Sequence, residues 1–114
     1  MKVSEIIEKC QLKKVVFATN HEVNNGYCGD LMSDVMANAQ PDSIWITIQA
    51  HKNSLAVALI KDIKAIIFTN NVSIHQEVIA KAKEERINLF QTGKDSFTVS
   101  GEIYSMLEAE TEKD

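Results

Sequence analysis

Alternating polar side chains in WITIQAHKNS, from Trp45 to Ser54, are the feature of this sequence best suited to chemistry. Thr47, Gln49, His51 and Asn53 occupy every second position, and Ile44, Ile46 and Ile48 occupy the positions between and before them. Side chains at every second position of a strand point to the same face. The pattern therefore predicts a strand with one apolar face and a row of hydrogen-bonding groups on the other.

A second cluster of polar residues is the stretch NNGYCGD, just before a predicted helix. Glycines in front of a helix can let backbone amides approach an anion. The stretch lacks the G-x-x-x-x-G-K-[ST] pattern of a phosphate loop, and Asp30, as the N-cap, would occupy the amides that a phosphate needs. The simpler interpretation is a tight turn in which Gly26, and with it Gly29, adopts a positive φ.

Few reactive arrangements can be built from these residues. Cys28 beside His51 would form a thiolate pair if their two loops meet. Asp30 and Asp34 lie one helical turn apart and could hold a divalent cation, although acids at this spacing are usually solvated. A serine nucleophile would need a G-x-S-x-G turn, which the sequence lacks. We therefore assign no catalytic residue and no metal ligand, and we expect no cofactor.

The polar row admits three interpretations. In the first, Trp45 packs in the core, Thr47 bonds locally, and the remaining polar groups meet water as the strand ends. In the second, the row converges with the Gly26–Asp30 turn on a small polar ligand or a partner chain, and in the third it is the seam of a dimer. Asn53 could also cap the following helix, which would remove it from any ligand shell. The candidate binding residues are Gly26, Tyr27, Cys28, Gly29, Asp30, Thr47, Gln49, His51 and Asn53.

The elements that must position these residues alternate between strand and helix. Apolar runs of strand length lie at 14–19, 43–48, 65–69 and 87–92, and helical patterns lie at 4–9, 30–39, 54–63, 73–86 and 96–110. Ser73 and Gln76 have the spacing of a capping box, and Gly101 is a weak point inside the last helix. The alternation predicts a layered single α/β domain with a four-stranded or slightly larger, mostly parallel sheet flanked by helices.

Polarity differs between the two ends of this predicted sheet. Ligands of open parallel sheets gather beyond the carboxyl ends of the strands. The segments expected there, 19–30, 49–54 and 69–73, are rich in Asn, Thr, Gln, His and Gly, whereas those expected at the opposite end look like ordinary solvated connections. The asymmetry predicts a functional face at the carboxyl end.

Composition limits the classes of function. The 114 residues, 45% of them hydrophobic, suit one domain, which we place at 1–107 with an acidic frayed tail at 108–114. No apolar run reaches the roughly 18 residues of a membrane span, and MKVSEIIEKC is too charged for a signal peptide, so we expect a cytoplasmic protein. The net charge of −4 and the lack of a Lys/Arg cluster argue against a nucleic-acid partner. Cys10 and Cys28 lack zinc-site spacing and are expected to be reduced and buried.

Two motifs carry a resemblance to a known family. The run G-Y-C-G-D-L-x-S-D-V-M-A-N-A, followed by W-I-T-I-Q-x-H-x-N, resembles the DRTGG domain family, and the similarity extends from about Ser4 to Leu107. Where the name-giving D-R-T-G-G would fall, the chain has NHEVNNG. There Asn20 stands for Asp, His21 for Arg, Asn24 for Thr and Asn25 for the first Gly, and only Gly26 is kept. No role of the charged Asp and Arg is therefore carried over.

The resemblance implies a fold and a class of function. Such domains occur alone or as regulatory inserts in phosphotransacetylases and in pyrophosphatases with CBS domains, and they are similar in fold to the N-terminal domain of HPr kinase. This implies a non-catalytic regulatory module that acts as a homodimer and binds a small polar ligand, such as a nucleotide or phosphorylated metabolite, or a partner protein. The alternatives are a small enzyme or phosphoryl-group handler that uses His51, Cys28 and Asp30, or an accessory protein of a hydrogenase-like redox system.

Overall fold

A five-stranded sheet in the order β1-β5-β4-β3-β2 forms the centre of the computed structural model, which describes residues 1–112. The strands are β1 (Lys13–Val16), β2 (Asn25–Cys28), β3 (Ser43–Thr47), β4 (Ala65–Phe68) and β5 (Leu89–Gln91). Strands β2 to β5 are parallel to one another, and β1 pairs antiparallel with β5. The predicted α/β class and mostly parallel sheet are thus confirmed, with one strand more than the four expected runs.

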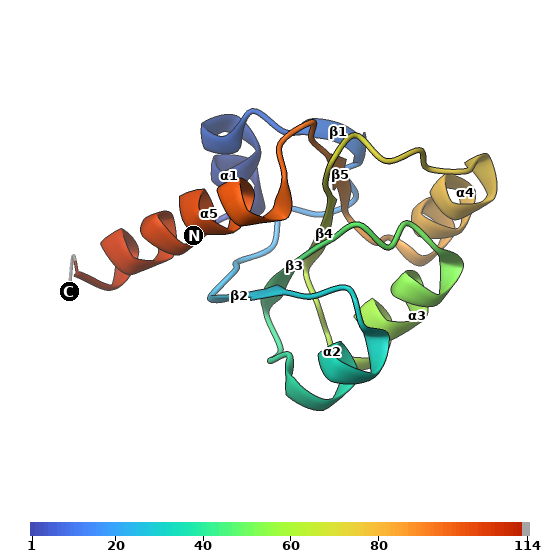
Figure 1. Ribbon diagram of the computed structural model, residues 1–114, viewed down its shortest axis with the longest axis horizontal. Coiled ribbons are helices and arrows are strands. Elements are labelled where there is room, and N and C mark those ends of the chain that lie inside the picture. The colour runs from blue at the N-terminus through green and yellow to red at the C-terminus, as the bar shows by residue number, and fades with distance from the viewer. Residues whose placement is uncertain (113–114) are drawn as a thin grey trace.

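Helices cover both faces of the sheet (Figure 1). They are α1 (Val3–Cys10), α2 (Met32–Asn38), α3 (Lys52–Ile60), α4 (Gln76–Glu85) and α5 (Ser96–Glu112). Helices α2, α3 and α4 pack on one face and α1 and α5 on the other. Because β2 to β5 follow one another across the sheet in chain order, crossovers of one hand place their helices on the same face. Within residues 1–112, no helix is both long and apolar enough to cross a membrane.

Helix α5 is longer than the sequence pattern predicted. It continues to Glu112, and its last turns project beyond the rest of the domain in Figure 1. Of the acidic tail expected at 108–114, residues 108–112 are therefore helical, and residues 113–114 lie outside the described part of the chain.

The central strands are buried on every residue because helices cover both of their faces. Trp45 and Phe68 point into the layer beneath α2 to α4. Ile44, Ile46 and Ile67 point into the layer beneath α1 and α5. The apolar runs that predicted β3 and β4 are therefore the residues that hold the two layers together.

Strand β2 corrects the predicted turn. Gly26 is extended and pairs in register with Ile44 of β3, and no glycine within residues 1–112 has a positive φ. The sequence does not predict a strand at NGYC because Asn and Gly have low strand propensity. Cys28, expected to be buried, is exposed because β2 is an edge strand, whereas Cys10 is buried as predicted.

The direction of β1 corrects the composition of the carboxyl-end face. Since β1 runs antiparallel to β5, residues 19–24 follow it at the amino end of the parallel strands. The amide of Asn24 donates there to the carbonyl of Asp42, at the start of β3. Of the predicted segment 19–30, only the residues that follow β2 reach the carboxyl ends of the parallel strands.

Two predicted helix caps are wrong, and the alternative role of Asn53 as a cap is excluded. Helix α2 begins after Leu31, so Asp30 precedes the cap position and does not cap the helix. Helix α4 begins at Gln76 with His75 as its N-cap and without a side-chain cap, which leaves Ser73 too far upstream for a capping box. Asn53 lies inside α3 and does not cap it.

Asn88 connects three segments at the amino end of the sheet. Its Oδ1 accepts the amides of Ala18 at 2.7 Å and Thr19 at 3.2 Å, and its Nδ2 donates to the carbonyls of Thr19 at 2.7 Å and Lys64 at 3.0 Å. The side chain is buried, so water cannot replace these bonds. Asn88 therefore fixes the start of the chain between β1 and β2 against the segments that precede β4 and β5.

We expect Asn88→Ala to lower the free energy of unfolding by about 3 kcal/mol, because it leaves several partly buried backbone groups without their partner. Urea denaturation measures this change. Asn53→Ala, at an exposed position of α3, is the matched control and should alter the value by less than about 0.5 kcal/mol. Equal effects of the two substitutions would contradict the role assigned to Asn88.

Candidate functional site

Asp30 joins the carboxyl ends of β2 and β3. Its Oδ1 accepts the hydroxyl of Thr47 at 2.8 Å and the amide of Ile48 at 3.0 Å. The Thr47 hydroxyl also accepts the amide of Gln49 at 3.1 Å, so Thr47 bonds locally as the first interpretation predicted. These polar groups are engaged with one another and fix the path of the chain after β3.

Gly29 and Tyr27 tie β2 to its neighbours. The indole Nε1 of the buried Trp45 donates to the carbonyl of Gly29 at 2.9 Å. The hydroxyl of Tyr27 donates to Asp34 on α2 at 2.5 Å. That hydrogen bond, with some burial and the nearby carboxylate charge, raises the pKa of Tyr27 above its ordinary value. Trp45 is thus in the core, as expected.

His51 and Asn53 do not continue the row that the alternation predicted. Strand β3 ends at Thr47, and His51 is the N-cap residue of α3. Both His51 and Asn53 are exposed, and neither takes part in a side-chain hydrogen bond found within residues 1–112. The polar groups of WITIQAHKNS therefore belong to a strand, a bend and a helix and do not share one face.

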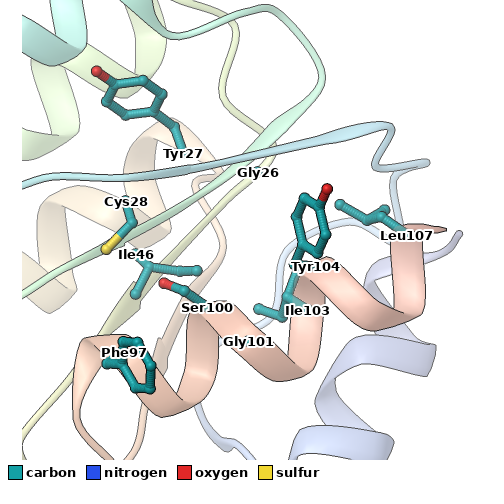
Figure 2. A pocket seen from close by; sticks show the side chains of 10 residues that line it. All are labelled: Gly26, Tyr27, Cys28, Ile46, Phe97, Ser100, Gly101, Ile103, Tyr104 and Leu107. Carbon is teal, nitrogen blue, oxygen red and sulfur yellow. The ribbon is translucent and has the colours of Figure 1, made fainter.

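An apolar groove lies between the edge strand β2 and helix α5, and we call it the β2–α5 groove. Its volume is about 390 Å³. Figure 2 shows β2 on one side and α5 on the other, with the ring of Tyr27 pointing away from α5. The groove is lined by Gly26, Tyr27, Cys28, Ile46, Phe97, Ser100, Gly101, Ile103, Tyr104 and Leu107.

The candidate residues thus fall into three places. Gly26, Tyr27 and Cys28 line the β2–α5 groove. The second group, which comprises Gly29, Asp30, Thr47 and Gln49, lies at the bonded carboxyl ends of β2 and β3. The third, His51 and Asn53, lies at the start of α3.

Sequence reasoning missed the helical wall of the groove. Phe97, Gly101 and Tyr104 recur at helical spacing, and Phe97 and Tyr104 are 88% and 68% exposed. Val99 and Ile103 of the same helix are buried in the core beneath it. The sequence shows the helical spacing of Phe97 and Tyr104, but it does not predict β2, the strand that forms the other wall of the groove.

The reactive arrangements considered from the sequence are not assembled. The Oδ2 of Asp34 accepts the hydroxyl of Tyr27, and Asp30 lies outside α2, so the two carboxylates do not face each other from one helix. Between Cys28 and His51, no hydrogen bond is found within residues 1–112. In the same part of the chain, no cluster of three or more His, Cys, Asp or Glu side chains could hold a metal ion.

A smaller, more polar cavity, with a volume of about 220 Å³, lies at the amino end of the parallel strands. Its lining includes the cationic Lys64 and Arg86, of which Arg86 donates to the carbonyl of Ala18 at 3.1 Å and Lys64 pairs with Asp62 at 2.8 Å. That hydrogen bond raises the pKa of Lys64, although burial acts against it. His21 also lines this cavity, where its Nε2 lies 2.7 Å from the hydroxyl of Thr19.

Comparisons with known proteins bear on this fold and site. The model of the DRTGG domain matches residues 5–106. The chain belongs to the DRTGG domain family. Its arrangement of strands and helices is similar to a crystal structure of the CBS and DRTGG domains of the regulatory region of Clostridium perfringens pyrophosphatase, complexed with activator, diadenosine tetraphosphate.

That similarity has a TM-score of 0.72 at 17% sequence identity. It shows only that the two proteins share a fold. It covers 89% of this chain and 45% of that chain, so the DRTGG domain spans less than half of the structure it matches. A search of the curated proteins gives no match.

Tyr27→Phe tests the bond to Asp34 through its dependence on pH. A raised pKa in the folded state stabilises the protonated hydroxyl, so this stability is present below the unfolded-state pKa of about 10 and is lost as the pH rises through the folded-state pKa. We expect wild type to melt above Tyr27→Phe by a constant margin between pH 7 and 9, and by a smaller margin above pH 10. Tyr104→Phe, at the chain's other tyrosine, should show no such convergence. A margin that stays constant up to pH 11 would contradict the bond.

Proposed function

We propose that this DRTGG domain is a non-catalytic regulatory module that binds a small ligand and acts as a homodimer. The observation that supports binding is the β2–α5 groove, which contains three of the candidate residues. Its volume of about 390 Å³ lies within the range of roughly 300–1,000 Å³ typical of small-molecule sites. The regulatory region of the pyrophosphatase, which is similar in fold, is described with a bound activator, and this supports a regulatory role.

The engaged polar groups favour binding over catalysis. A general base must have a lone pair within reach of the substrate proton. The Oδ1 of Asp30 is committed to Thr47 and Ile48, and the Oδ2 of Asp34 to Tyr27. These groups are better placed to hold the fold than to transfer protons. The cytoplasmic location and the lack of a nucleic-acid partner stay predictions.

A thermal-shift screen tests ligand sensing. Free bases, nucleotides and phosphorylated metabolites are added to the purified protein, and at least one class should raise the melting temperature, because a ligand that binds only the folded state stabilises it. If no compound raises the melting temperature, the proposal of a small ligand is contradicted and a protein partner is favoured.

His51→Ala separates a binding module from an enzyme. We expect wild type and His51→Ala to show equal, background rates with the phosphorylated compounds of the screen, because His51 lies outside the groove at the start of α3. Phosphate release measures these rates. A measurable turnover that falls by at least about 100-fold in His51→Ala, as the loss of a general base requires, would make the chain an enzyme.

The two edges of the sheet support the homodimer. Edge strands with exposed backbone groups invite pairing unless charges, bulges or cover prevent it. Strand β1 carries Lys13 and Lys14 and an irregular register, whereas the β2 residues Asn25 to Cys28 bear no charge. The unprotected edge favours an interface of two copies along β2.

Asn25→Lys should weaken this dimer at least about tenfold, because each copy would bring a charge to the same uncharged edge. Light scattering over a range of concentrations gives the mass. Gln49→Lys is the matched control, since it places the same charge at the end of β3, where the sequence offered an alternative dimer seam. If Gln49→Lys alone dissociates the dimer, the seam lies there and not along β2. A wild type that is monomeric throughout would contradict the homodimer.

A further inference from the structure

The β2–α5 groove has no charged residue in its lining. The sheet contributes Ile46, and the helix contributes the apolar side chains of Ile103 and Leu107 and the rings of Phe97 and Tyr104. A phosphate or carboxylate placed among these groups would lose water without meeting a counter-charge, which is strongly unfavourable. The walls of the groove therefore select against anions.

Two glycines determine the shape of the groove. A Cβ on Gly101 would meet no atom within 4 Å, and a Cβ on Gly26 would touch Ile44, Ile103 and Leu107 only at ordinary distances of 3.8 to 3.9 Å. The absence of both side chains leaves room between strand and helix. Phe97 and Tyr104 project from α5 beside this space, and a flat ring could cover their exposed faces.

The hydroxyl of Ser100 interrupts the apolar lining. The hydroxyl of Ser100 is shielded from solvent and finds no hydrogen-bond partner in the described part of the chain, although Ser100 lines the groove. Its oxygen points toward the strand side in Figure 2, near Ile46. A serine hydroxyl both donates and accepts and turns readily between rotamers, so it can meet either kind of ligand group.

We propose that the β2–α5 groove binds an uncharged, flat ring compound with hydrogen-bonding groups at its edge, of the size of a free purine or an indole. The inference rests on the proposed ligand-sensing function and specifies its ligand class. The aromatic and aliphatic walls contact the ring, and Ser100 bonds its polar edge. The phosphate of a nucleotide finds no cationic partner in this lining.

Glycine-selective ¹⁵N labelling provides a direct test, because the chain has only four glycines. Gly26 and Gly101 line the groove, whereas Gly29 and Gly93 do not. Adenine and indole are titrated as uncharged probes, with AMP as the anion matched to adenine. We expect both uncharged probes to shift the amide signals of Gly26 and Gly101 and to leave Gly93 unchanged. AMP should bind at least about tenfold more weakly than adenine.

Gly101→Leu should fill the groove and weaken the binding of adenine and indole at least about tenfold. The shift of the Gly26 amide signal during the titration measures this affinity. Gly93→Leu is the matched control, since a Cβ there also meets no atom within 4 Å but lies outside the groove. Phe97→Ala removes an exposed ring and provides a second weakened variant should Gly101→Leu disturb the fold. Far-UV circular dichroism checks the fold of all three.

Several results would overturn the inference. If AMP binds at Gly26 and Gly101 as tightly as adenine, the ligand class is wrong, but the proposed ligand sensing stands. Probes that shift only Gly29 would place the ligand at the carboxyl ends of β2 and β3 and would also spare the proposed function. If no probe binds and Gly101→Leu changes the mass by light scattering, a second copy occupies the groove. If no probe binds, the mass is unchanged and the thermal-shift screen is silent, ligand sensing fails with the inference.

Discussion

The parallel pairing of β2 with β3 is the interaction on which the candidate site depends. Because β1 runs antiparallel to its neighbour, it ends at the amino end of the parallel strands. The chain returns to the carboxyl end of those strands through β2. That return brings Asp30 to the hydroxyl of Thr47, and the carbonyl of Gly29 to the indole of Trp45. It also makes β2 an edge strand that leaves Gly26 and Cys28 beside α5. Without this strand there would be neither a bonded carboxyl end nor a groove.

Strand order explains why the groove lies at an edge of the sheet and not at its carboxyl end. Ligand crevices in open parallel sheets form where the order of strands reverses, because the helices on the two sides then diverge. Strands β2 to β5 follow one another without a reversal, and α2, α3 and α4 all pack on one face. The opposite face is covered mainly by α1 and α5. Space for a ligand therefore remains where α5 passes the short edge strand.

The sequence predicted those elements whose residues carry their own signal. The runs around Trp45 and Ile66 identified buried strands because helices on both faces demand continuous apolar side chains. The short strand NGYC has no such signal, since it gains its place from pairing with β3 and not from strand propensity. For the same reason the sequence predicts only part of the hydrogen bonding of the polar row. Thr47 bonds locally as foreseen, but its partner, Asp30, could be identified only once β2 was known.

The shared position of Gly26 and Cys28 couples the two proposed properties of this domain. Both residues line the β2–α5 groove, and both belong to the uncharged edge along which a second copy would pair. A ligand in the groove and a partner at the edge would then share three residues of β2, Gly26, Tyr27 and Cys28. Thermodynamic linkage requires that any change the ligand makes in dimer affinity be matched by an equal change that the dimer makes in ligand affinity. If both proposals hold, the edge strand and the groove beside it would let ligand binding change the affinity of one copy for another.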